Sequence, residues 1–264
     1  MKTRITFSLV LLISFTFICD LKLSAQNPAW MNFTNGDVIT DIADYGNILY
    51  IATSGGLVKY NKVTTQTEFF NKGNSGLPRN EISEIDIEAN GDLWIITEAG
   101  LSKYDGSNWT LYDTINSNLP NQFIYDISID QNGVKWIASY MGLISFDGTV
   151  WAIYDTSNSN ISSQFTSRVF ISPTGEKWIC TSNGMERFDG NSWILYDYNV
   201  APFSFYNTTD MVFKNNEVYV ATHGDFSQGE GLVKFDGSVW TSYTTVNSGL
   251  PYERVECLAL DTSG

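Results

Sequence analysis

The sequence has little histidine, little cysteine and few basic residues. Its 264 residues include one histidine, three cysteines and 15 lysines and arginines, against 29 aspartates and glutamates, so the formal net charge is −14 at pH 7. Nucleic acids and anionic membrane surfaces repel a protein of this charge, which argues against both as partners. The scarcity of histidine and cysteine argues in the same way against a metal centre built from these ligands. We therefore expect no cofactor and no metal.

The sequence also lacks an apolar run long enough to span a bilayer. Lys2 and Arg4 precede a mostly apolar stretch over residues 5–18, which is shorter than a transmembrane helix requires, and a small residue, Ala25, follows it. These three features are typical of a secretory signal peptide. We expect residues 1–25 to be removed and residues 26–264 to be exported to the periplasm, the cell surface or the medium, without direct membrane insertion.

Two cysteines lie beyond the predicted signal peptide. Cys180 takes a strand position at which other repeats of the chain carry alanine or isoleucine, so we expect a small core residue there. Cys257 lies almost two repeats later, and we expect no disulfide between the two.

The sequence repeats itself about every 42 residues. Trp94, Trp136 and Trp178 are spaced by 42 residues, and Tyr50 and Tyr219 occupy the same position in the units before and after. Each unit then continues with a glycine and an aromatic residue. In most units an Asp-Gly pair follows, and after it come a tryptophan and, three residues later, a tyrosine. The Asp-Gly pairs are at 105–106, 147–148, 189–190 and 236–237.

Each repeat contains four short strand signals. In the unit that begins near Ile82, apolar residues mark strands over 82–87, 93–97, 101–104 and 109–112, separated by turn residues such as Asn90-Gly91. Four strands in a period of 40–50 residues are typical of one blade of a β-propeller. We therefore expect an all-β fold, a β-propeller of four-stranded antiparallel blades with about five complete blades.

The two ends of the repeat region predict incomplete units. Trp30 to Phe33 resembles an isolated fourth strand, and residues 255–261 resemble the first strand of a sixth unit. We expect a truncated ring that is incomplete at the C-terminus, and the sequence leaves the total number of blades open. Complete units are expected to begin near Ile39, Ile82, Phe123, Thr166 and Asn207.

The repeat resembles a known family. Each unit is similar to the two-component regulator propeller repeat. The shared order is an inner strand, an Asn-Gly-type turn, Trp-Ile-x-Thr, Gly-Leu, an aromatic residue followed by aspartate, an aromatic residue, and Asn-Ser-x-Leu-Pro. The best copies are at 93–120 and 133–154. The resemblance implies one of two contexts in Bacteroidetes. One is the periplasmic, glycan-recognising half of a hybrid two-component regulator. The other is a secreted or surface protein with a C-terminal sorting domain for type IX export.

On these grounds we expect a non-catalytic extracytoplasmic recognition or scaffold module of a secreted or surface protein. The alternative is a glycan-sensing domain of a hybrid two-component regulator. A propeller lyase or glycosidase is the third alternative, and the sequence argues against it, because it has no nucleophile elbow, phosphate loop or histidine-rich motif. The expected partner is a glycan or a cell-surface protein, and no catalytic residue is predicted.

Departures from the repeat supply the candidate site. Six extra residues enter the fifth unit between Tyr219 and Gly231, and the linker before that unit is unusually aromatic. Such loops either contact a ligand or are tolerated surface insertions. The candidate ligand-binding residues are His223, Asp225, Phe226, Glu230, Tyr140, Phe203, Phe205 and Tyr206.

Two sets of repeated residues have structural alternatives. Acidic residues recur on the first strands, where they could form a cation-binding ring, hydrogen-bonded structure or a solvated edge; they are Asp41, Glu84, Asp126 and Asp210, with Arg168 and Cys257 as exceptions. The repeated tryptophans are expected in the core, because a residue present in every blade usually packs between blades. They are Trp94, Trp136, Trp178, Trp109, Trp151, Trp193 and Trp240.

Overall fold

The computed structural model describes residues 38–197, 199–201, 208–223 and 231–260. The chain divides after residue 35, and all described residues belong to the unit of residues 36–264. The predicted signal peptide and the predicted strand at Trp30 to Phe33 therefore lie outside the described residues. Every regular element in the described ranges is a β-strand.

The strands form five four-stranded antiparallel sheets, and each sheet follows the chain order. Blade 1 contains β1 (Ile39–Tyr45), β2 (Ile48–Thr53), β3 (Gly56–Asn61) and β4 (Thr67–Phe70). Blade 2 contains β5 (Glu84–Ile87), β6 (Leu93–Thr97), β7 (Gly100–Tyr104) and β8 (Trp109–Tyr112). Blade 3 contains β9 (Ile124–Ile129), β10 (Lys135–Ser139), β11 (Gly142–Phe146) and β12 (Trp151–Tyr154). Blade 4 contains β13 (Thr166–Ile171), β14 (Lys177–Thr181), β15 (Gly184–Phe188) and β16 (Trp193–Tyr196). Blade 5 contains β17 (Thr208–Lys214), β18 (Glu217–Thr222), β19 (Leu232–Phe235) and β20 (Trp240–Tyr243).

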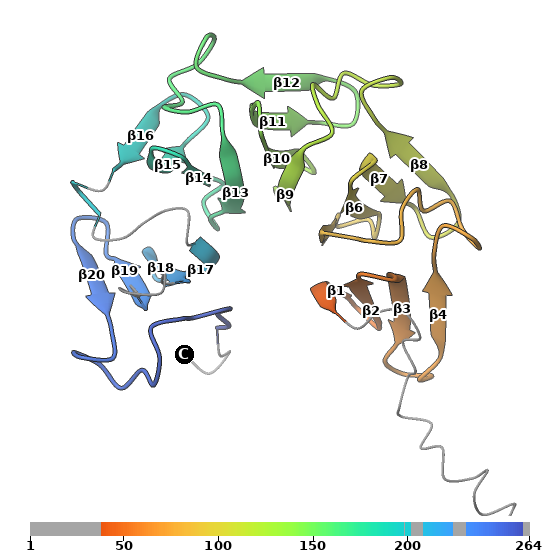
Figure 1. Cartoon of the computed structure of the whole chain (residues 1–264), viewed down its shortest axis with the longest axis horizontal. Coiled ribbons are helices and arrows are strands. Elements are labelled where there is room, and N and C mark those ends of the chain that lie inside the picture. Colours follow the sequence, from red (N-terminus) through yellow and green to blue (C-terminus); the bar gives the residue numbers. More distant parts are fainter. Residues whose placement is uncertain (1–37, 198, 202–207, 224–230, 261–264) are drawn as a thin grey trace, which may run out of the picture. The chain divides into compact units, whose positions relative to one another are not determined.

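The five blades follow one another around a common centre, as Figure 1 shows from orange (blade 1) to blue (blade 5). The first strand of each blade is innermost and the fourth is outermost. Neighbouring blades touch through their inner strands, β1 against β5, β5 against β9 and β9 against β13. The fold is a β-propeller, as the repeat predicts.

The hydrophobic core lies between blades. Each of four clusters of buried side chains draws on two successive blades, from blades 1 and 2 to blades 4 and 5. The second strands β6, β10 and β14 are buried along their whole length, because a blade packs against a neighbour on each face. A single blade would expose these apolar faces, so each blade depends on its neighbours for stability.

The repeated tryptophans form two sets that differ in burial. Trp94, Trp136 and Trp178 are buried, which confirms the prediction for this set. The second set is half-buried and packs on the edge of the core, where each ring stacks on the aromatic residue that precedes its hairpin turn. The stacked pairs are Tyr104–Trp109, Phe146–Trp151, Phe188–Trp193 and Phe235–Trp240, with ring centroids 4.6, 4.0, 4.3 and 4.5 Å apart.

The two described cysteines match their predictions. Cys180 is buried in the cluster between blades 4 and 5, and Cys257 is exposed. Neither forms a disulfide, and burial raises the pKa of the Cys180 thiol to about 12, which keeps it protonated and unreactive.

The segment after blade 5 behaves as the start of a further unit. Val255 N–H donates to the Thr222 carbonyl, and Thr209 Oγ1 donates to the Val255 carbonyl. Between blades 1 and 2, Ile82 makes the same two bonds with Thr53 and Thr40. Residues 255–260 therefore follow the path of a first strand, as predicted, although they form no regular strand.

Gly142 opens β11 with φ of +114°, and a Cβ at this position would collide with the Tyr154 carbonyl oxygen at the end of β12. Gly148, in the next turn, has a similar φ of +104°, but a Cβ there would meet nothing within 4 Å. Alanine would have an unfavourable positive φ at both positions, but only at Gly142 would its Cβ also collide with the backbone.

We predict that Gly142→Ala destabilises the protein more than Gly148→Ala. The backbone strain alone costs on the order of 1–3 kcal/mol at both positions, and only Gly142→Ala adds a steric collision with backbone. Urea unfolding of both variants checks this. Equal free energies of unfolding for the two variants would contradict the geometric explanation.

Candidate functional site

The carboxylates on the inner strands link successive blades. Asp41 accepts the Ile42 N–H through Oδ1 at 2.7 Å and the N–H of Ile85, in the next blade, through Oδ2 at 2.9 Å. Two other blades repeat the second bond: Asp126 accepts from Val169, and Asp210 from Leu258, both at 2.7 Å. The hydrogen-bonded interpretation of the repeated acids is therefore confirmed for these three aspartates.

Blade 2 departs from this arrangement. Its residue in the repeated position, Glu84, makes no such bond, and Asp86 replaces it two residues later. Asp86 accepts the Ile87 N–H through Oδ1 and the Ile129 N–H of blade 3 through Oδ2, both at 2.7 Å. Burial raises the pKa of Asp86 to about 6, against the opposing effect of these two hydrogen bonds.

Glu84 instead faces a central cavity of about 410 Å³ lined by the inner strands. Arg168, which stands at the aspartate position of blade 4, lies with Nη1 3.6 Å from Glu84 Oε2. Burial, followed by the nearby carboxylates of Asp126 and Asp41, raises the pKa of Glu84, and Arg168 opposes this shift. A guanidinium thus already occupies the acidic centre. Among the described residues, no group of three histidine, cysteine, aspartate or glutamate side chains is placed to hold a metal ion.

Two of the predicted ligand-binding residues are described. Tyr140 is 60% exposed, and its ring lies edge-on to Phe165 at 6.2 Å; Phe165 in turn lies 5.5 Å from Tyr125. His223 forms an isolated antiparallel bridge with Arg254. The other six predicted residues lie outside the described residues; they are Asp225, Phe226, Glu230, Phe203, Phe205 and Tyr206.

A second polar feature recurs between blades, which we call the acid–tryptophan–lysine unit. Between blades 2 and 3, Glu88 Oε1 accepts the Trp94 indole N–H at 2.7 Å and the Lys135 ammonium at 3.0 Å. The same ammonium lies 4.8 Å from the centroid of the Trp94 ring. The carboxylate and the aromatic ring together compensate for burial of the lysine, which is 3% exposed.

The unit recurs between blades 3 and 4. Asp130 Oδ2 accepts the Trp136 indole N–H at 3.0 Å and lies 3.8 Å from Lys177 Nζ. Lys177 Nζ is 4.4 Å from the centroid of the Trp136 ring. Asp130 Oδ1 meanwhile accepts two N–H groups of its own turn, from Asn132 and Val134.

Between blades 4 and 5 the unit loses its acid and its lysine but keeps its tryptophan. Ser172 stands at the acid position, where its single oxygen accepts the Glu176 N–H and so retains the turn. Val218 stands at the lysine position, because it pairs with Phe213 as Lys177 pairs with Ile171. The Trp178 indole N–H is buried and has no hydrogen-bond partner in the described part of the chain.

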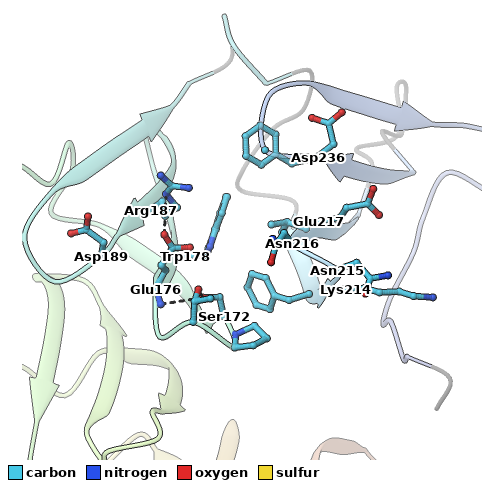
Figure 2. A pocket seen from close by; sticks show the side chains of 16 residues that line it. Ser172, Glu176, Trp178, Arg187, Asp189, Lys214, Asn215, Asn216, Glu217 and Asp236 are labelled. Carbon is cyan, nitrogen blue, oxygen red and sulfur yellow. Dashed lines mark hydrogen bonds and ion pairs between the residues drawn. The ribbon is translucent and has the colours of Figure 1, made fainter. Parts of the chain in front are cut away.

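A pocket of about 720 Å³ lies where the unit is broken, and Ser172, Trp178 and Val218 all line it. Figure 2 shows Trp178 and Arg187 of blade 4 on one side and Asn215, Asn216 and Glu217 of blade 5 on the other. Phe213 and Phe235 add aromatic surface. Asn215 and Asn216 form the turn between β17 and β18 with φ of +53° and +64°, a backbone conformation that asparagine tolerates better than most residues.

The pocket carries charges of both signs. Arg187 Nε lies 3.7 Å from Glu176 Oε1, and its guanidinium carbon lies 6.0 Å from the centroid of the Trp178 ring. Turn N–H groups lower the pKa of Asp189 and of Asp236, and the hydrogen bond from Lys234 lowers the pKa of Glu217. These three carboxyls are therefore ionised at neutral pH, and each accepts hydrogen bonds rather than donating them.

No motif recognised in the sequence predicts this pocket. Its signal is the coincidence of two substitutions, Ser172 and Val218, at positions where the two preceding interfaces carry an acid and a lysine. Each substitution is unremarkable alone, and they matter together only because the two positions face each other across an interface.

Solved structures identify the fold. No family model and no curated protein matches the sequence. The extracellular domain of a putative hybrid two-component system from B. thetaiotaomicron is similar with a TM-score of 0.68 and 18% identity, over 90% of this chain and 32% of that one. This structural similarity establishes that the fold is a β-propeller. It also confirms, at the level of fold, the resemblance that the repeat predicts.

Two other similar structures have different roles. PorZ, a surface component of the type-IX secretion system of Porphyromonas gingivalis, has a TM-score of 0.63 and 17% identity over 85% of this chain and 36% of its own. Virginiamycin B lyase from Staphylococcus aureus has a TM-score of 0.60 and 11% identity over 80% of this chain and 71% of its own. The chain spans about a third of the two-component domain and of PorZ. The same fold thus serves regulators, secretion components and enzymes.

We predict that Glu84→Gln makes the protein less sensitive to alkaline pH. Because the pKa of Glu84 is raised in the folded state, the unfolded chain loses this proton first as the pH rises above about 4.5. The free energy of unfolding of the wild type therefore falls relative to that of the variant between pH 5 and pH 8, by about 1–3 kcal/mol.

Urea unfolding at four pH values measures this difference. Glu98→Gln, at an exposed position in the turn between β6 and β7, is the control. Its free energy of unfolding should change with pH as that of the wild type does. If the free energies of unfolding of wild type and Glu84→Gln differ by the same amount at every pH, Glu84 is ionised in the folded protein and the prediction is wrong.

Proposed function

We propose that this chain is a non-catalytic recognition module that works outside the cytoplasm, as part of a secreted or surface protein, and that it holds its ligand in the pocket between blades 4 and 5. The observation that carries the proposal is the broken acid–tryptophan–lysine unit at Trp178. At the two preceding interfaces the same place is filled by the protein's own side chains. Here it is an open pocket of about 720 Å³, a typical volume for a small-molecule site.

The charges of the pocket favour binding over catalysis. A glycosidase needs one carboxyl that holds a proton at neutral pH, and a lyase needs a base that can take one up near that pH. Asp189, Glu217 and Asp236 have lowered pKa values and so are poor proton donors and weak bases. Their chemistry suits hydrogen bonds and ion pairs with a bound ligand.

The extracytoplasmic location has two supports. The basic and apolar start of the chain resembles a signal peptide, and the similar structures include an extracellular domain and a surface component. The described residues hold no helix with the length and apolarity needed to cross a bilayer.

A sensing role in a hybrid two-component regulator is the second candidate. The observation that favours it is the similarity of fold to the extracellular domain of such a system. In this role the same pocket would bind a ligand, such as a glycan fragment, and pass the signal to segments beyond this chain.

We predict that Arg187→Gln weakens ligand binding at least fivefold, whereas Lys59→Gln leaves it unchanged. Arg187 lines the pocket and can donate charge-assisted hydrogen bonds, which contribute about 1.5–3 kcal/mol each. Lys59 holds the same cross-strand position in blade 1, opposite Tyr50 as Arg187 is opposite Trp178, and is the matched control.

The test uses isothermal titration calorimetry with neutral and acidic oligosaccharides, the common amino acids and short peptides as probes. Mass spectrometry of each bound probe after incubation shows whether it has been altered. Recovery of an unchanged probe supports the proposal. Turnover of a probe, or equal affinity of Arg187→Gln and wild type for every bound probe, would overturn it.

A further inference from the structure

The protein itself shows which chemical groups fit against the tryptophan that lines the pocket. At each of the two preceding interfaces, a carboxylate oxygen accepts the indole N–H and an ammonium lies on the ring. The ammonium and the carboxylate oxygen are 3.0 Å apart in one unit and 3.8 Å apart in the other. The equivalent tryptophan, Trp178, has neither group from the described residues at its acid and lysine positions.

The missing groups leave two unmet requirements. The Trp178 indole is 2% exposed and its N–H has no partner among the described residues, and an unpaired buried donor costs about 1–3 kcal/mol. The ring also lacks the ammonium that its two counterparts carry, and Arg187, at 6.0 Å, corresponds to Lys103 of blade 2 rather than to the missing lysine. A ligand that supplied both groups would replace what the protein omits.

We propose that the pocket between blades 4 and 5 binds an α-amino group together with the carboxyl or carbonyl oxygen of the same residue, the chemistry of a free amino acid or of a peptide N-terminus. The oxygen accepts the Trp178 indole N–H, and the ammonium lies against the indole ring. One carbon atom separates the two groups, which keeps them as close as the carboxylate and ammonium of the existing units. The inference rests on the proposed function, because it names the ligand class of the same pocket.

The charged residues around the pocket suit a ligand with both charges. Arg187 and Lys214 are cations that can pair with a carboxylate, and Glu217 and Asp236 are anions that can pair with an ammonium. The volume of about 720 Å³ exceeds that of one carboxylate–ammonium pair, so it leaves room for the ligand's own side chain or for a second residue. The acidic protein as a whole attracts the cationic end of such a ligand.

Phe213 is the residue that adapts the empty pocket. It replaces the isoleucine of blades 2, 3 and 4, which in blade 4 is Ile171, and its ring lies 6.3 Å from that of Trp178. Because the Phe213 ring already packs against Trp178, we expect it to turn aside when a ligand places an ammonium on the indole ring. The aromatic contact also explains how the unliganded interface tolerates the loss of the lysine.

The first experiment measures binding by isothermal titration calorimetry with L-alanine, L-phenylalanine, L-lysine and trialanine, each also in its N-acetylated form. Binding of at least one unmodified probe, and a loss of affinity of tenfold or more on N-acetylation, is the expected result. Trialanine distinguishes a peptide N-terminus from a free amino acid. Equal affinity for the acetylated form, or no binding by any of these probes, overturns the inference.

The second experiment restores the unit in the protein. The triple variant Ser172→Asp, Phe213→Ile, Val218→Lys copies Asp130, Ile171 and Lys177 into the blade 4–5 interface. We expect it to bind the amino acid probe at least tenfold more weakly and to unfold at a higher temperature, because its own side chains satisfy Trp178. Unchanged affinity in the folded variant would place the ligand elsewhere.

Two further variants keep the test informative. If the triple variant does not fold, Val218→Lys alone is the probe, with folding checked by circular dichroism, and the same loss of affinity is expected. The reverse variant Asp130→Ser, Ile171→Phe, Lys177→Val opens the blade 3–4 interface, and a second binding event there would support the inference. Unchanged affinity in folded Val218→Lys, or no second event in the folded reverse variant, overturns it.

The outcomes separate this inference from the proposed function. Binding of an oligosaccharide, but of no amino acid or peptide, with sensitivity to Arg187→Gln would overturn the ligand class and leave the recognition module intact. Turnover of an amino acid or peptide probe would overturn the recognition module and leave the ligand class intact.

Discussion

The blades of this propeller are held together by the contacts that each makes with the next. A blade is a four-stranded sheet that is apolar on both faces, so it is stable only when a neighbour covers each face. At the centre this contact is polar: a carboxylate on one inner strand accepts a backbone N–H from the next blade, as Asp41 does from Ile85 and Asp126 from Val169. The same side chain also accepts an N–H of its own strand, and the two bonds together fix the spacing and the register of two separate sheets.

A second polar contact lies nearer the edge of the interface and can be lost. The acid–tryptophan–lysine unit buries a lysine between blades, and a buried charge contributes little net stability when its partners only repay its desolvation. The fold therefore survives where Ser172 and Val218 replace two members of the unit. What changes is the local chemistry, because a buried indole N–H and an aromatic ring are left without their usual partners. The repeat makes this change recognisable, since two intact copies show what is missing.

The sequence predicted the fold well because the repeat encodes it locally. Each tryptophan, glycine and Asp-Gly turn specifies a strand or a hairpin within its own 42 residues, and the predicted units begin within a few residues of the observed inner strands. Pairings between blades were harder to predict. Asp86 takes over from Glu84 by a shift of two residues, and Glu84 is left against Arg168, two blades away, for which no local pattern exists. Of the predicted aromatic patch only Tyr140 is among the described residues, and it packs with Phe165 and Tyr125, which no sequence pattern marked as candidates.

A ligand in the pocket would also act on the interface itself. Its lining comes from both blades, with Trp178 and Arg187 on one side and Asn216 and Glu217 on the other (Figure 2). A molecule that contacts both sides binds the docked arrangement and not the separated blades, so it stabilises the interface in proportion to its concentration above the dissociation constant. At the blade 2–3 and blade 3–4 interfaces this stabilisation is constant, because the lysine and the carboxylate belong to the chain. Replacing them by a diffusible molecule makes the contact between two blades depend on the surroundings, which is the physical property that a recognition module needs if it is to report what it binds.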